Sequence, residues 1–95
     1  MLAKNPLEMP PEKKLTREGL IQAIRLSVIA ELDAINLYLQ FASATDDPLA
    51  RKVFEDIARE EKTHVGEFLA LLEKMDIEQV KELEKGRREV SEMEK

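Results

Sequence analysis

Two series of mainly apolar residues recur along this chain at alternating steps of three and four, and we call each series a seam. This spacing restricts the chain to helices. The first series is Leu20, Ile24, Ser27, Glu31, Ala34, Tyr38 and Phe41, and the second is Phe54, Ile57, Glu61, His64, Phe68, Leu71 and Met75. Such spacing gives a helix one continuous face to pack against a neighbour. We find neither a strand pattern nor an internal repeat. The sequence therefore predicts an all-α fold.

Two helix boundaries follow from the polar residues around these series. Thr16 is the expected N-cap of a first helix, which should end near Thr45. Asp47 followed by Pro48 predicts a new helix start, because proline is favoured at the first helical position. We expect this second helix to end at about Lys74. A short connection makes the two helices an antiparallel hairpin.

The remaining segments are predicted to be small. Residues 1–15 carry three prolines and are expected to form an extended N-terminal arm. Asp76 is the expected N-cap of a short third helix that ends at Gly86, a typical C-terminal residue. The predicted organisation is thus an arm, a helical hairpin with a short third helix over residues 16–86, and a charged tail or linker over residues 87–95.

Composition excludes several classes of function. The 95 residues contain no cysteine, which rules out disulfides, thiolate metal sites and cysteine nucleophiles. The net charge of −5 arises from intermixed acidic and basic residues, so we expect no nucleic-acid surface and no polybasic membrane anchor. No stretch approaches a membrane span, and the N-terminus lacks the pattern of a signal peptide. These features predict a soluble, cytoplasmic chain.

The first predicted helix carries more apolar surface than a hairpin covers. Besides the seam, it holds a second apolar set: Ile21, Leu26, Val28, Ile29, Leu32, Ile35, Leu37 and Leu39. A helix that is apolar over so much of its circumference needs cover on more than one side. We therefore expect the chain to self-associate, as small domains of this kind often do.

Three potential metal ligands share one level of the predicted hairpin. Glu61 and His64 are three residues apart, which places both on one helix face. Counted from the turn at residue 46, Glu31 lies as far before it as Glu61 lies after it. At about 1.5 Å per residue, all three side chains lie roughly 23–27 Å from the turn. Buried carboxylates need a compensating partner, and a metal ion is one candidate.

Alternatives remain open for this cluster. Glu61 and His64 could form a buried hydrogen-bonded pair, or both could face solvent if the seam is shifted by one residue. With Glu31 at the same level we favour a metal site. Two hairpins related by a two-fold axis would present four carboxylates and two imidazoles, which is the ligand set of di-iron four-helix bundles. Oxygen and imidazole ligands suit iron or manganese, although zinc or copper could compete.

Three further residues are candidates near this site. Tyr38 lies two helical turns from Glu31 and is either a core tyrosine or a hydrogen-bond partner or electron donor for the metals. Asp33 and Glu60 are close to the ligands in sequence but off the seam. They are either surface carboxylates or an auxiliary site that passes metal ions inward.

These motifs resemble the encapsulated ferritins, short ferritin-like hairpins housed within encapsulin nanocompartments. The resemblance covers residues 16–86 and rests on the segments Ala30–Tyr38 and Glu60–His64. It implies half a ferritin fold, with a dimer interface that holds a di-iron ferroxidase centre formed by Glu31, Glu61 and His64, with Tyr38 nearby. It also implies ring-shaped homo-oligomers of dimers, such as decamers, that oxidise Fe(II) while the encapsulin shell stores the mineral.

The resemblance has departures that bear on function. Relatives can carry an acidic residue in place of Ala30 and an aromatic one in place of Leu37. The charged C-terminal stretch shows no apolar docking peptide, which fits either a truncated chain or the N-terminal domain of a shell fusion. We expect an iron-oxidising enzyme for iron storage. The alternatives are a non-catalytic helical assembly module and a di-metal oxidase or peroxide-removing ferritin-like protein.

Overall fold

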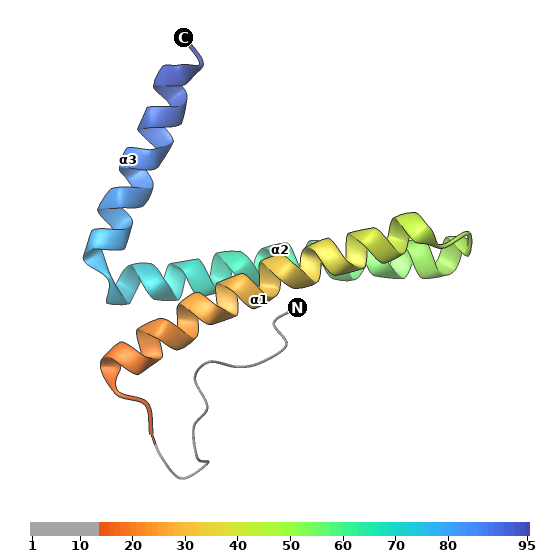
Figure 1. Cartoon of the computed structure of the whole chain (residues 1–95), viewed down its shortest axis with the longest axis horizontal. Coiled ribbons are helices and arrows are strands. Elements are labelled where there is room, and N and C mark those ends of the chain that lie inside the picture. The colour runs from red at the N-terminus through yellow and green to blue at the C-terminus, as the bar shows by residue number, and fades with distance from the viewer. Residues whose placement is uncertain (1–13) are drawn as a thin grey trace.

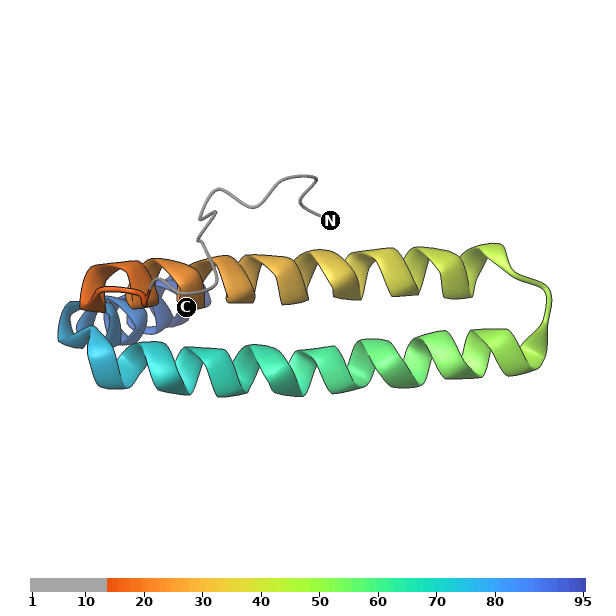
Figure 2. The same cartoon turned by 90° about the horizontal axis from the view of Figure 1, so that it is seen from below.

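The chain forms an antiparallel helical hairpin from which a third helix projects. The computed structural model describes residues 14–95, with α1 at Arg17–Ala44, α2 at Pro48–Met75 and α3 at Ile77–Met93. Helices α1 and α2 lie side by side along their lengths, whereas α3 contacts α2 only near their junction and then stands away (Figures 1 and 2). The all-α prediction and the predicted hairpin are confirmed. The predicted N-terminal arm lies outside the described residues, apart from its last two.

The predicted caps of the two hairpin helices are both present. The Thr16 hydroxyl accepts a hydrogen bond from the Gly19 backbone N–H at 3.0 Å. Asp47 Oδ1 accepts two, from Leu49 and Ala50 at 2.9 and 3.0 Å. Side-chain acceptors at these positions satisfy backbone donors that the first helical turn leaves unpaired. Local sequence therefore determines where each helix of the hairpin begins.

Arg51 closes the turn between α1 and α2. Its Nε donates to the Ala42 carbonyl at 3.0 Å and its Nη2 donates to the Thr45 carbonyl at 2.8 Å. Both carbonyls belong to the C-terminal end of α1, where acceptors are unpaired and a positive charge is favoured. The first turns of α2 thereby hold the end of α1, which stabilises the hairpin connection.

Helix α3 is longer than the sequence predicted. It was expected to end at Gly86, but it continues to Met93 through most of the predicted tail. Gly86 keeps a helical backbone, because no glycine among the described residues has the positive φ of a C-terminal cap. The residues that follow are mainly good helix formers such as Arg and Glu, and they extend the helix past the glycine.

The buried core of the hairpin is small and shifted relative to the predicted seam. The buried apolar residues are Ile24, Ala34, Ile35, Ala42, Ala58 and Leu72. The predicted seam residues Phe41 and Leu71 are instead 45 % and 44 % exposed. Their neighbours Ala42 and Leu72 take the inward positions, because two helices bury only a narrow strip between them. These two seam positions, like Leu20 at 39 % exposed, are therefore not covered by the hairpin alone, and their burial in a four-helix bundle stays a prediction.

Apolar side chains remain on the surface of every helix. The most exposed are Leu49 on α2 and Ile77 and Met93 on α3, at 70 %, 63 % and 79 %. The molecule measures only 19 Å along its shortest axis, about two helix diameters, so the hairpin has no second layer to cover such residues. None of the three described helices combines the length and the apolar character that a membrane crossing requires.

Candidate metal centre

The hairpin brings Glu31 of α1 together with Glu61 and His64 of α2. His64 Nδ1 lies 3.6 Å from Glu31 Oε2 and 3.5 Å from Glu61 Oε2. One potential ligand atom from each residue lies within 4.8 Å of the others. The antiparallel geometry therefore puts the three side chains at one level, as the count from the turn predicted.

Burial of the three side chains is uneven. Glu31 and Glu61 are largely covered, with 21 % and 17 % of their side chains exposed, whereas the His64 side chain is 46 % exposed. The cluster is thus enclosed by the hairpin on one side and open on the other. Because Glu61 is covered, the alternative in which Glu61 and His64 both face solvent is wrong.

Glu31 Oε2 is buried and has no hydrogen-bond partner among residues 14–95. Both distances from His64 Nδ1 exceed the range of about 2.7–3.2 Å for an N–H···O bond. The hydrogen-bonded Glu61–His64 pair considered from the sequence is therefore not formed. A buried unpaired oxygen is costly, and a positive ion placed among the three groups would compensate it.

The donor set fits a divalent metal ion. Two carboxylates supply hard oxygen ligands and negative charge, and the imidazole supplies one nitrogen, a combination suited to iron or manganese. Three residues from one chain leave coordination positions empty, since di-iron bundles draw on four carboxylates and two imidazoles. The three side chains of one hairpin therefore equal half of that ligand set in number and kind.

Tyr38 contacts aromatic residues on both helices. Its ring is stacked on that of Phe54, with centroids 6.3 Å apart and an interplanar angle of 20°. Phe54 also packs against Phe41 at 5.5 Å. This pair was not predicted from the sequence, although Tyr38 and Phe54 lie equally far from the turn at residue 46 and the count that placed the two acidic residues and the histidine applies to them as well. A role for Tyr38 at the metals stays a prediction.

Asp33 and Glu60 do not belong to the cluster of three. Glu60 is exposed on α2, and Asp33 is partly buried on α1, where it has an interaction of its own. In the part of the chain that the structure describes, Glu31, Glu61 and His64 are the residues whose ligand atoms converge. An auxiliary metal-uptake role for Asp33 and Glu60 stays a prediction.

Comparison with known proteins places the chain in a family. The profile described as Rubrerythrin matches residues 22–95, which includes the whole cluster. The chain belongs to the rubrerythrin family. A crystal structure of the encapsulated ferritin domain from Pyrococcus furiosus is similar over 97 % of this chain and 94 % of that one, with a TM-score of 0.86 and 52 % identity. The resemblance to encapsulated ferritins is confirmed.

Two curated relatives of this rubrerythrin-family chain are longer than it is. It is 53 % identical over 93 residues to a ferritin-like–encapsulin shell fusion protein of Pyrococcus furiosus, covering 98 % of this chain and 27 % of that protein. It is 39 % identical over 75 residues to the encapsulin nanocompartment cargo protein EncC of Myxococcus xanthus, covering 79 % of this chain and 58 % of that protein. The chain thus spans less than two thirds of either relative.

Proposed function

We propose that two copies of this chain pair across the Glu31–Glu61–His64 cluster and form a ferroxidase centre that oxidises Fe(II) to Fe(III). The observation that carries the proposal is the convergence of these three side chains around a buried, unpaired oxygen of Glu31. The ferritin-like family supports iron as the metal, and the hard oxygen donors agree with it.

A second copy would complete the site from its open side. A two-fold axis beside His64 doubles the ligand set to the four carboxylates and two imidazoles of a di-iron bundle. Exposed apolar residues on the ligand-bearing faces favour this contact, since Leu20 lies three turns from Glu31 and Leu71 lies two turns from His64, and they are 39 % and 44 % exposed. Pairing would build a four-helix bundle from two hairpins, and further contacts would extend the dimers to a ring, such as a decamer.

The chemistry at this site is metal-centred electron transfer. Two Fe(II) ions would each give up one electron, and O₂ would take both electrons with two protons to form hydrogen peroxide. Four carboxylates balance the charge of two divalent cations, and the imidazoles complete their coordination. The chain's own task is to hold two ions close together in a partly apolar setting.

The names of the relatives indicate where this reaction takes place. The Pyrococcus protein is a fusion with an encapsulin shell, and the Myxococcus proteins are encapsulin cargo. We infer that this chain likewise works inside an encapsulin nanocompartment in the cytoplasm, where the shell protein is its partner and stores the oxidised iron.

An Fe(II) oxidation assay in air tests the proposal. The wild-type protein should oxidise Fe(II) faster than buffer alone, and His64→Ala should lose that acceleration by about tenfold or more, since even residues that only support metal ligands typically contribute that much. Oxidation is followed by ferric absorbance, and bound iron is measured in parallel.

Glu67→Ala is a matched control for this assay. Glu67 is an exposed carboxylate one turn beyond His64 on α2 and lies outside the cluster. Its loss removes one negative charge from the same helix and should leave both the oxidation rate and the iron content unchanged. Normal iron content and oxidation in His64→Ala would show that the proposed site is wrong.

A further inference from the structure

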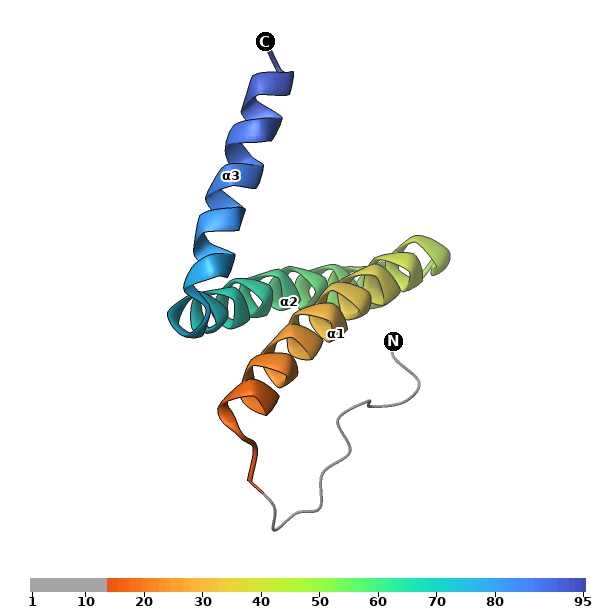
Figure 3. The same ribbon diagram turned by 60° about the vertical axis from the view of Figure 1, so that its left-hand side comes forward.

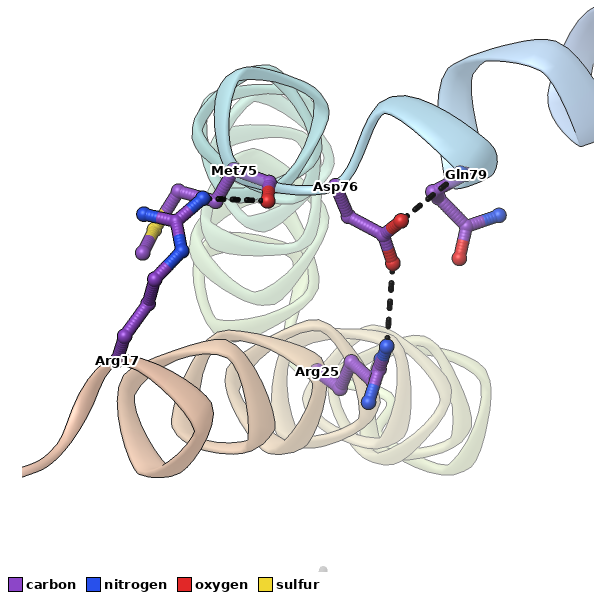
Figure 4. A network of polar contacts seen from close by, with 5 residues as sticks. All are labelled: Arg17, Arg25, Met75, Asp76 and Gln79. Atoms are coloured by element: carbon purple, nitrogen blue, oxygen red, sulfur yellow. Dashed lines mark hydrogen bonds and ion pairs between the residues drawn. The ribbon is translucent and has the colours of Figure 1, made fainter.

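The junction between α2 and α3 is held by two arginines of α1. We call residues Met75–Ile77 the elbow. Arg17 Nη2 donates to the Met75 carbonyl at 2.8 Å, and Arg25 Nη2 forms an ion pair with Asp76 Oδ2 at 3.1 Å (Figure 4). These contacts join residues 58 and 51 positions apart in the sequence. The first half of α1 is thereby connected to the point where α3 begins.

Asp76 interacts with all three helices at once. Its backbone N–H donates to the Leu72 carbonyl at the end of α2, at 2.9 Å. Its Oδ1 accepts from the Gln79 N–H at 3.1 Å and caps α3, while Oδ2 faces Arg25 of α1 (Figure 4). The two carboxylate oxygens thus have separate roles, one within α3 and one across to α1.

Within the part of the chain that the structure describes, few other contacts fix the direction of α3. The helix contacts α2 only near the elbow and projects away from the hairpin over most of its length (Figures 1 and 3). Its 17 residues form a lever about 25 Å long. A rotation of about 20° at the elbow would move the far end by about 9 Å. A small change of angle at the elbow therefore corresponds to a large displacement of Met93.

We propose that the Arg25–Asp76 ion pair, the clasp, is a conformational device that locks the direction of α3. With the clasp closed, α3 holds one angle to the hairpin. With it open, α3 swings about residue 76 while its own helix and the hairpin stay folded. The clasp is partly exposed, with 51 % of the Arg25 and 22 % of the Asp76 side chain accessible, so high ionic strength weakens it.

A fixed direction of α3 has a consequence for assembly. Exposed apolar residues on α3, such as Val90 and Met93, point where the clasp directs them. A fixed direction restricts the positions at which a second copy can meet them. This consequence rests on the proposed self-association, whereas the clasp itself does not and is tested on metal-free protein.

Two substitutions separate the clasp from the cap. Arg25→Met removes the ion pair and keeps a long side chain that favours helix. Asp76→Asn keeps the cap, because asparagine is as good an N-cap as aspartate, but turns an amide N–H₂ toward Arg25 and abolishes the ion pair. Both variants should therefore have the same effect, and the double variant should add nothing to either.

Spin labels give the angle directly. The chain has no cysteine, so Ser43→Cys on the hairpin and Ser91→Cys on α3 introduce two unique labelling sites at exposed positions. Pulsed electron spin resonance on metal-free protein, diluted into unlabelled chain, then measures the distance within one molecule. We expect a narrow distribution of label-to-label distances for the wild type. In Arg25→Met and Asp76→Asn the width of this distribution should increase to several ångströms. In 1 M NaCl the wild-type distribution should widen toward those of the variants, and theirs should not change.

Arg59→Met is the matched control. Arg59 forms an exposed ion pair with Asp56 at the same 3.1 Å distance, but within α2 alone. Loss of this ion pair should leave the distribution of label-to-label distances narrow. Circular dichroism should show equal helix content in every variant. The proposal is overturned if the clasp variants keep the wild-type distribution, or if Arg59→Met widens it as much as they do.

Discussion

The proposed metal ligand Glu31 carries a cost for the isolated fold. Its Oε2 is buried without a hydrogen-bond partner, and the nearest nitrogen, His64 Nδ1, is 3.6 Å away. An unsatisfied buried polar atom typically costs about 1–3 kcal/mol, and the partial exposure of this side chain favours the lower end. Such a cost is expected where a residue is kept for binding and not for stability.

Glu31→Met should therefore stabilise the metal-free chain by about 1 kcal/mol, because it removes the unpaired oxygen and keeps the length of the side chain. Denaturant unfolding in the presence of chelator measures this. Glu67→Met, at an exposed position, should have little effect. A metal-free Glu31→Met protein less stable than wild type would mean that the carboxylate supports the fold through a contact of its own.

The convergence of Glu31, Glu61 and His64 could be predicted from sequence, but the environment of their side chains could not. Equal distance from the turn was enough to place Glu31, Glu61 and His64 at one level, because helical rise is constant. The unpaired Glu31 oxygen and the half-exposed His64 ring depend on rotamers and on the rotation of each helix. Neither is determined by spacing along the chain. The stacking of Tyr38 on Phe54 required both helices to be considered together.

At the scale of helices, glycines at interior positions lower the stability of the fold relative to alanine. Gly66 and Gly86 both lie inside helices, and an added Cβ would meet no atom within 4 Å at either position. Gly19 differs, since its Cβ would lie 3.2 Å from the capping Oγ1 of Thr16. Glycine in a helix interior costs roughly 0.5–1 kcal/mol relative to alanine.

Gly66→Ala should raise the melting temperature of the hairpin by roughly 2–8 °C, and Gly86→Ala should increase the helicity of α3. Both changes reduce the conformational entropy of the unfolded chain without a clash. Calorimetry and circular dichroism measure them. Gly19→Ala should raise the melting temperature less, because its added Cβ would lie close to the capping Oγ1 of Thr16. A lower melting temperature for Gly66→Ala would mean that a second chain approaches the backbone at that position.

All three helix starts and the ends of α1 and α2 agree with the sequence predictions, whereas the end of α3 does not. Thr16, Asp47 and Asp76 are side-chain caps whose chemistry is local, and all three act as predicted. Gly86 predicts a helix end, but glycine also adopts helical angles, and the charged residues after it continue the helix. The direction of α3 depends on the clasp from α1, a contact between residues far apart in sequence.

At the scale of the whole molecule, a single chain leaves apolar side chains and the Glu31–Glu61–His64 cluster partly exposed. The described part of the chain buries few side chains and exposes apolar residues on all three helices, and its three converging residues are half of the proposed six-ligand site. The sequence indicated this incompleteness through the excess of apolar residues on the first helix. It could not indicate which of those residues the hairpin itself would cover, because that depends on how the two helices are rotated.

Metal binding and assembly should therefore be linked. If the site is complete only when two chains meet, metal binds the dimer more tightly than the monomer and shifts the equilibrium toward dimer. At a metal concentration of about 100 times its dissociation constant, each of the two ions tightens association about 100-fold if it binds only the dimer, so two ions together should tighten it about 10⁴-fold relative to chelator. Without metal, the interface brings two Glu31 and two Glu61 carboxylates together, where repulsion and lost hydration oppose association.

Analytical ultracentrifugation at low protein concentration measures this linkage. Chelator should lower the associated fraction, and Fe(II) under anaerobic conditions or redox-inert Zn(II) should restore it. Replacing both carboxylates, as Glu31→Gln with Glu61→Gln, should abolish Fe(II) oxidation and make assembly insensitive to metal, because the neutral amides neither repel one another nor bind the ion as strongly. An association constant that is equal with and without chelator in the wild-type protein would place the metal away from the subunit interface.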